Sequence, residues 1–377
     1  MTRWTWRAIW AGLGAALSLI NEPFGFWPAA FGALAAAFWL FREKPTIHAF
    51  AQGWWFGFGY FAVTFHWIVH PFFVQPDLHG WLFPFGILGL AGGAAIYWGL
   101  AFTLANRIRR WGAVDIPTLI VCMTLFEAAR GVLFSGFPWG MLAQGFVETG
   151  LGQMLAFVGP HGLGLVILLL AALPVIMRIR IGLPLALVAF VGLEVGGQLR
   201  LSEPTALRDF TVRLLQANND QALKFDPLWS NRFFRQNLEL SRSAGDFDIV
   251  VWPENAVIWD MQRYPDIREN VSAAAFGKPV LLGGNHGVDG SFFNTLAAIG
   301  PGGEVLRYSD KVHLVPFGEF IPFRFALDVL GLSDVLPGSY THGSWFELVH
   351  LEGVPTYLSL ICYEMIFPRY ATAGGAR

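Results

Sequence analysis

The sequence is poor in charged residues, in cysteine and in side chains spaced as metal ligands. Only 14% of its 377 residues are Asp, Glu, Lys or Arg, and a net charge of −2 offers no basic surface to a nucleic acid. It has two cysteines, and the only possible disulfide partner of Cys362 is Cys122, which lies inside a long apolar run where a packing role is expected. No two His, Cys or carboxylate residues show metal-ligand spacing, so we expect no metal and no other cofactor.

The sequence is rich in apolar and aromatic residues, which are distributed unevenly. The hydrophobic fraction is 54%, and 12 of the 16 Trp lie before residue 200, many near the ends of apolar runs, where indole rings mark a membrane interface. The same segment holds ten of the 25 Lys and Arg, and the shorter remainder holds fifteen. We therefore predict a transmembrane helical domain at 1–199 and a globular domain at 200–377.

Seven apolar runs in the first domain predict a polytopic helical bundle. They are Trp6–Ile20, Phe26–Phe41, Ala49–Val69, Trp81–Leu104, Ile116–Phe134, Leu151–Met177 and Ile181–Gly197. A spanning helix needs about 20 residues, so the first two are short and could form a hairpin that does not fully cross. A signal peptide is the alternative for the first run, but six more runs follow and no small-residue cleavage site is evident.

The basic residues of the connecting segments predict the orientation. Alternate connections contain nine Lys and Arg, and the intervening short ones contain none. By the positive-inside rule, the N-terminus is cytoplasmic and an odd number of crossings places residues 200–377 outside. The nine residues are Arg3, Arg7, Arg42, Lys44, Arg107, Arg109, Arg110, Arg178 and Arg180.

Within one span, Glu127 and Arg130 are three residues apart and can pair on a helix face, either to hold the bundle together or to contact lipid.

The second domain alternates short strands and helices, as a layered α/β domain does. We expect strands at Thr211–Ala217, Phe247–Trp252, Pro279–Gly283 and Phe292–Ile299, with a further strand ending at Cys362. Helices are expected at Trp229–Ser243 and near Ile267–Phe276.

Three local patterns in this domain could carry chemistry. Glu254 follows a hydrophobic strand and Pro253, where an apolar setting favours a general base. Lys311 precedes an apolar segment with Pro and Gly, and Cys362 ends a buried strand beside Tyr363. A protonated thiol is a poor nucleophile, but a base and a cation that stabilises an oxyanion would activate it. Taken singly, each residue could equally be a helix-start glutamate, a surface lysine or a core cysteine.

In their order and spacing, these three residues resemble the Glu-Lys-Cys triad of the nitrilase (carbon–nitrogen hydrolase) superfamily. A domain of this kind behind a membrane bundle resembles the apolipoprotein N-acyltransferase family. Motifs of the first domain support that match: Pro23–Pro28, the aromatic run Gly53–Ile68, and Gly136–Trp139. The resemblance implies an αββα sandwich, with Glu254 as general base, Lys311 as oxyanion stabiliser and Cys362 as nucleophile. It also implies active-site support from Glu319, Tyr363 and Glu364.

The resemblance further implies the reaction and its surroundings. A phospholipid would donate a fatty acyl chain to Cys362 as a thioester, and the α-amino group of a diacylglyceryl-modified N-terminal cysteine of an apolipoprotein would accept it. The expected location is the bacterial inner membrane, with a periplasmic catalytic domain and a monomeric chain. The family continues for about a hundred residues past its cysteine and then adds a span. We therefore expect an incomplete sandwich, either because the sequence is a truncated piece of a longer protein, which we favour, or because it is a shortened and inactive relative.

Two other functions fit the same residues. A membrane-anchored amidase or nitrilase would use the triad with water as acceptor, and a closed polar pocket would favour it over an open acyl cleft. An inactive envelope or conjugation factor on the acyltransferase scaffold would be expected to have lost triad residues, and all three are present here.

Overall fold

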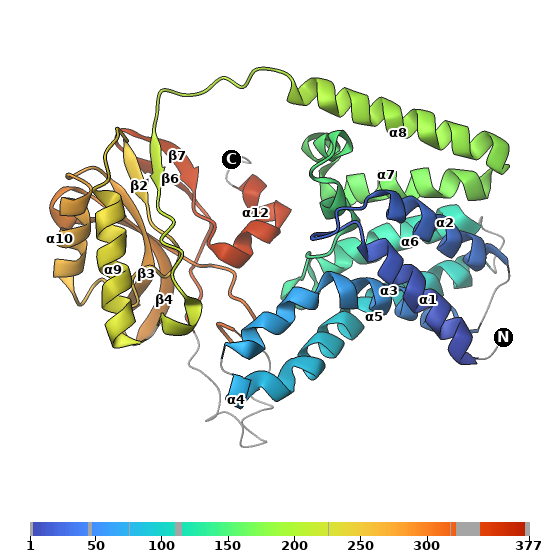
Figure 1. Ribbon diagram of the computed structural model, residues 1–377, viewed down its shortest axis with the longest axis horizontal. Helices are drawn as coiled ribbons and strands as arrows, with labels where there is room; N and C mark the ends of the chain where they lie inside the picture. Colours follow the sequence, from blue (N-terminus) through green and yellow to red (C-terminus); the bar gives the residue numbers. More distant parts are fainter. Residues whose placement is uncertain are drawn as a thin grey trace. The chain divides into compact units, whose positions relative to one another are not determined.

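The structure, a computed structural model, divides the chain into two compact units, Met1–Thr205 and Ala206–Arg377 (Figure 1). It describes residues 3–43, 47–74, 76–109, 115–224, 226–316, 318–321 and 340–373. The predicted domain boundary after residue 199 falls in the last turn of the helix that ends at Leu201.

Helices of 16 to 27 residues overlap each of the seven predicted spans. They are α1 (Arg3–Ser18), α2 (Pro28–Glu43), α3 (Ala49–Thr64), α5 (Phe83–Arg109), α6 (Asp115–Arg130), α7 (Leu155–Ile176) and α8 (Ile179–Leu201). By length and composition, three described segments could cross a membrane: Gly80–Arg109, Gly150–Ile176 and Ile179–Leu201. The other four helices have 16 residues each, fewer than the roughly 20 that a crossing requires. The structure thus establishes a helical bundle with three candidate spans.

Short helical segments connect the long ones. They are η1 (His66–Phe73), α4 (Pro76–His79), η2 (Gly80–Leu82), η3 (Leu133–Ser135), η4 (Leu142–Phe146) and η5 (Gly150–Met154).

Helices α1 and α3 pack closely because each has a glycine at the contact. A Cβ atom at Gly14 would collide with the backbone oxygen of Phe56. A Cβ atom at Gly59 would likewise collide with the backbone of Ala11. Small residues allow this approach in bundles that lack a hydrophobic driving force between helices. Beside the contact, the buried rings of Trp10 and Phe56 meet edge to face, with centroids 6.1 Å apart.

Glu127 and Arg130 form the predicted ion pair, and it is buried. Arg130 Nη2 lies 2.7 Å from Glu127 Oε2, and Trp98 Nε1 donates to Glu127 Oε1 at 2.6 Å. Arg130 also donates to the backbone oxygens of Phe137 and Trp139. Because both residues are buried and the guanidinium holds the following turn, the contacts favour the role of holding the bundle together.

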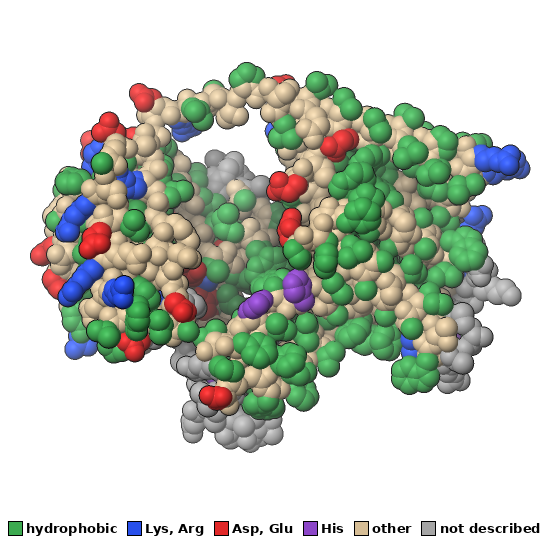
Figure 2. All heavy atoms as spheres, viewed as in Figure 1, with side chains coloured by type: hydrophobic (Ala, Val, Ile, Leu, Met, Phe, Trp, Pro, Cys, Tyr) green, Lys and Arg blue, Asp and Glu red, His purple; other side chains and the backbone are tan. Residues whose placement is uncertain are grey.

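Helix α8 exposes an almost continuous apolar surface. Leu187, Val188, Val191 and Val195 are each more than half exposed. Figure 2 shows hydrophobic side chains covering much of the first unit, whereas charged side chains are frequent on the second. An apolar surface of this extent on a helix long enough to cross a bilayer is typical of contact with lipid.

The second unit is built on a mixed five-stranded sheet in the order β1-β2-β3-β4-β5. The strands β1, β2 and β3 pair in parallel, and the β3–β4 and β4–β5 pairs are antiparallel. The five are β1 (Val212–Leu214), β2 (Ile249–Val251), β3 (Val280–Val288), β4 (Ser291–Ile299) and β5 (Val305–Asp310).

Helices cover one face of this sheet, and a second sheet covers the other (Figure 1). Helices α9 (Pro227–Ser241) and α10 (Pro265–Ala274) pack on the first face through Leu238 and Val271. Strands β6 (Leu348–Leu351) and β7 (Val354–Leu358) pair antiparallel and pack on the other face. The described residues therefore form three layers, α–β–β, of the predicted sandwich. The shorter elements are η6 (Gln221–Leu223), η7 (Pro301–Gly303), η9 (Cys362–Ile366) and α12 (Pro368–Ala373).

The prediction of a strand ending at Cys362 is wrong at its end. Strand β7 ends at Leu358, and Cys362 begins η9 with a φ of 50°. A non-glycine residue in this left-handed region interrupts a strand. The prediction for the first strand was also too long, and β5 and β6 were not predicted.

Candidate active site

Glu254 lies just beyond the carboxyl end of β2. The backbone N–H of Trp252 still bonds to the oxygen of Leu281 at 2.8 Å, but Pro253 has no N–H and ends the ladder. The indole of Trp252 is buried and donates to Ser241 Oγ at 3.0 Å, which anchors the turn. Glu254 is therefore presented at the sheet edge with a side chain that is 33% exposed.

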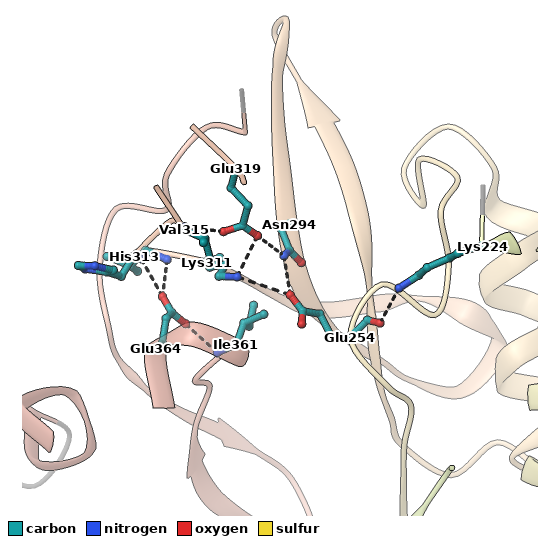
Figure 3. A network of polar contacts seen from close by, with 10 residues as sticks. Lys224, Glu254, Asn294, Lys311, His313, Val315, Glu319, Ile361 and Glu364 are labelled. Atoms are coloured by element: carbon teal, nitrogen blue, oxygen red, sulfur yellow. Dashed lines mark hydrogen bonds and ion pairs between the residues drawn. The ribbon is translucent and has the colours of Figure 1, made fainter. Parts of the chain in front are cut away.

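Lys311 is the centre of the polar network in Figure 3. It follows β5, and its backbone N–H donates to the oxygen of Asn294 at 2.9 Å. Its side chain is 1% exposed, with Nζ 2.8 Å from Glu319 Oε1 and 3.5 Å from Glu254 Oε1. Burial lowers the pKa of Lys311, but the hydrogen bond and charge of Glu319, together with the charge of Glu254, outweigh burial and raise the pKa overall. The side chain is therefore an ammonium ion held between two carboxylates.

Asn294 joins the same two carboxylates from β4. Its Nδ2 donates to Glu254 Oε1 at 2.9 Å and to Glu319 Oε1 at 3.0 Å, and the residue is 1% exposed. Since an amide NH₂ only donates, it bridges two acceptor oxygens and holds the two carboxylates beside each other. Glu254 Oε1 thus accepts from Asn294 and forms an ion pair with Lys311, whereas these contacts do not involve Oε2. Sequence reasoning missed Asn294; its only signal was a polar residue inside the predicted strand Phe292–Ile299.

Glu364 ties the lysine segment to the cysteine segment. Its Oε1 accepts from the backbone N–H groups of Val312 and His313 at 2.7 and 2.8 Å, and its Oε2 accepts from Ile361 at 2.7 Å. Burial raises the pKa of Glu364, and these three hydrogen bonds oppose that rise. With both oxygens committed to backbone and only 1% exposure, Glu364 positions the chain on either side of the site.

Cys362 is exposed and close enough to Glu254 to hydrogen-bond with it. Desolvation raises the pKa of the thiol, and the negative charge of Glu254 raises it further, while Lys311 acts in the opposite direction. The resting group is therefore a neutral thiol beside a carboxylate that can accept its proton. The structure thus brings Glu254, Lys311, Glu319 and Cys362 into one site.

Tyr363 forms part of the wall behind the cysteine. It is 3% exposed, and its ring centroid lies 5.2 Å from that of Phe367 and 5.6 Å from that of His313. Burial raises the pKa of Tyr363 to about 12, and burial with the nearby Arg369 lowers the pKa of His313 to about 4. Both rings are neutral at pH 7, so the wall supports the site by packing.

A cleft of about 230 Å³ opens beside Glu254. Its polar lining comes mainly from amide side chains, with one lysine and the glutamate itself. The lining residues are Gln216, Ala217, Asn218, Asn219, Lys224, Ser230, Phe233, Pro253, Glu254, Asn255, Ala256, Ile258 and Trp259. Across the described part of the chain, no three His, Cys, Asp or Glu residues are grouped so that they could hold a metal ion.

Comparison with known proteins matches both units. The model of the apolipoprotein N-acyltransferase N-terminal domain matches residues 13–173, and the carbon–nitrogen hydrolase model matches residues 212–377. The apolipoprotein N-acyltransferase of Allorhizobium ampelinum is 32% identical, over 96% of this chain and 75% of that protein. Those of Rhodopseudomonas palustris and Brucella suis are 32% and 31% identical, over 99% and 96% of the chain and 77% and 75% of their own lengths.

Proposed function

The chain belongs to the apolipoprotein N-acyltransferase family, and we propose that it moves a fatty acyl chain from a phospholipid, through a thioester on Cys362, to the α-amino group of an apolipoprotein. The acceptor is the diacylglyceryl-modified N-terminal cysteine of that apolipoprotein. One observation carries the assignment of residues. A buried ammonium, Lys311, is held between Glu319 and Glu254, and Glu254 is close enough to the exposed thiol for its charge to raise the pKa of that thiol.

In the first half-reaction, Glu254 takes the thiol proton as the sulfur of Cys362 attacks the ester carbonyl. The C–S bond forms, and the carbonyl oxygen becomes an oxyanion. Lys311 has three N–H donors, and two face Glu319 and Glu254, so the third can stabilise this oxyanion. The C–O bond to glycerol then breaks, and the proton on Glu254 passes to the leaving alcohol, which departs as lysophospholipid.

In the second half-reaction, the acceptor amine attacks the thioester carbonyl. Glu254 accepts a proton from the attacking nitrogen as the C–N bond forms, and Lys311 again stabilises the oxyanion. The C–S bond breaks, and the proton on Glu254 returns to the sulfur of Cys362. The enzyme is restored, and the product is an amide.

Two features support the transferase over the alternatives. Cys362 is exposed, as a thiol that must meet a lipid ester would be, whereas a hydrolase would enclose it in a closed polar pocket. The three triad residues are present in one unit, where an ion pair joins Lys311 to Glu254 and both charges act on the thiol of Cys362, which argues against an inactive scaffold.

The proposal includes a location in the bacterial inner membrane, with seven spans, a cytoplasmic N-terminus, a periplasmic second unit and a monomeric chain.

Contacts at one end of the bundle support this orientation. Arg109 donates to the oxygen of Phe41 at 2.6 Å and lies 3.1 Å from Asp115, and Arg42 donates to the oxygen of Val175 at 2.6 Å. The basic ends of α2 and α5 therefore meet beside the end of α7, and basic residues gathered at one end of the bundle fit a cytoplasmic surface. Of the nine basic residues counted, Lys44 and Arg110 lie outside the described residues.

Intact-mass analysis of the chain expressed in a bacterial membrane tests the assignment. We expect a hydroxylamine-sensitive fatty-acyl adduct that disappears in Cys362→Ala and persists in Cys122→Ala, because Cys122 is buried in α6. An adduct that survives in Cys362→Ala would contradict the role of this thiol.

A further inference from the structure

Lys224 is a second lysine beside the proposed base, in surroundings unlike those of Lys311. It lies between η6 and α9, and its Nζ reaches toward the backbone oxygen of Glu254 at 3.5 Å (Figure 3). Among the described residues, no carboxylate lies within 4 Å of this ammonium, whereas Lys311 has two. Lys224 thus brings a positive charge to the cleft without a counter-ion in contact.

The cleft around Lys224 is suited to an anion with several acceptor oxygens. Gln216, Asn218, Asn219 and Asn255 line it with Lys224, and each amide can supply N–H donors. Burial lowers the pKa of Lys224, while the charge of Glu254 acts in the opposite direction. A bound anion would favour the charged form of the lysine, because opposite charges stabilise each other strongly where water is excluded.

We propose that this cleft binds the phosphate of the donor phospholipid, with Lys224 as its counter-ion and the lining amides as further donors. The proposal rests on the proposed function, since it places the head group of the same substrate. In a glycerophospholipid the reacting ester and the phosphate share one glycerol. Glu254 likewise links the reacting site and the cleft, because its carboxylate lies near the thiol of Cys362 and its backbone oxygen lies near Lys224.

The carboxylate of Glu254 does not prevent this binding. Its Oε1 already faces two donors, Lys311 and Asn294, which offset its charge. The four charged groups Glu254, Glu319, Lys311 and Lys224 sum to zero, so the phosphate enters a neutral surrounding instead of a negative one. Without Lys224 the three remaining charged residues would have a net charge of about −1, which would repel the lipid phosphate.

The test compares two acyl donors in the full chain in detergent micelles. One is dipalmitoyl phosphatidylglycerol, and the other is p-nitrophenyl palmitate, which has no phosphate. With the phospholipid we expect Lys224→Met to lower kcat/KM for acylation of Cys362 roughly ten- to a hundred-fold, as for loss of one charge-assisted contact. We expect less than a twofold change with the p-nitrophenyl ester. Lys224→Arg should keep most of the activity, and the control Lys278→Met, in the same unit, should resemble the wild type.

Two kinetic outcomes would overturn the proposal: an equal loss with both donors, which would mean a structural role, and full activity of Lys224→Met with the phospholipid.

Inhibition distinguishes the source of the phosphate. We expect sn-glycerol 3-phosphate to compete with the phospholipid in the wild type but not in Lys224→Met. Equally strong inhibition by inorganic phosphate would show a general anion site and overturn the lipid assignment. Failure of the wild type to acylate Cys362 from either donor would instead reject the proposed function, and direct calorimetric binding of sn-glycerol 3-phosphate would still decide the role of the cleft.

Discussion

Replacing Asn294 with alanine removes the uncharged group that donates hydrogen bonds to both Glu254 and Glu319. A hydrogen bond to a charged group contributes about 1.5–3 kcal/mol, so each carboxylate loses a contact of that size. If the lost hydrogen bond positions Glu254 in the transition state, the full amount of about 1.5–3 kcal/mol raises the activation free energy, and acylation slows roughly ten- to a hundred-fold. Asn294→Asp should be slower still, because it puts a third carboxylate against the other two. The measurement is the single-turnover rate of thioester formation on Cys362, followed by intact mass with p-nitrophenyl palmitate as donor.

The matched control is Asn237→Ala. Asn237 is fully buried in α9 of the same unit, and its amide contacts no carboxylate within the described part of the chain. It therefore reports the cost of emptying a buried Asn site, which thermal unfolding in detergent monitors for both variants. Thioester formation by folded Asn294→Ala within twofold of the wild type, or an equal slowing in Asn237→Ala, would refute the role assigned to the bridge.

Two further predictions concern the cysteine and its neighbour. Burial and Glu254 raise the pKa of Cys362, so the rate of its alkylation by iodoacetamide should rise with pH around a midpoint above about 8.5, the ordinary thiol value. A midpoint below that value would contradict the conclusion that the resting group is a neutral thiol. Glu364→Ala leaves three backbone N–H groups without their acceptor, which costs about 1–3 kcal/mol for each N–H that water does not reach. We therefore expect the variant to unfold at a lower temperature and to acylate Cys362 more slowly. Glu364→Gln should be intermediate. An unchanged unfolding temperature in Glu364→Ala would show that water replaces the carboxylate.

The sequence predicts the triad because each member follows a local pattern. A strand that ends in proline presents Glu254, and a lysine before an apolar segment and a cysteine between aromatic and acidic residues mark the other two. The bridge by Asn294 could not be predicted in this way, since it depends on strand register. Thr295 pairs with Asp310 across β4 and β5, and this places Asn294 beside Lys311. No local property of residues 292–299 encodes that pairing.

The missed strands have a related physical cause. Strand β5 contains Arg307, Tyr308, Ser309 and Asp310, and β6 contains His350, so neither has the apolar run that identified the other strands. Strand β5 is an edge strand of the five-stranded sheet, and β6 belongs to a two-stranded sheet. Strands in such positions are half solvated, and their existence is decided by their partners. The four 16-residue helices show the same limit for the first unit, because hydropathy located the seven long helices of the described residues but did not determine which ones cross.

The two unequal distances around Lys311 explain why the site needs a second carboxylate. If Glu254 were the only partner of the ammonium, transfer of the thiol proton to Glu254 would leave Lys311 without a counter-ion at the step that uses its charge. Glu319 instead binds Nζ at 2.8 Å and leaves Glu254 at 3.5 Å. When Glu254 takes the proton and becomes neutral, Lys311 keeps its partner and its position. In the proposed mechanism, its remaining N–H is then available to the oxyanion at the moment when that charge appears.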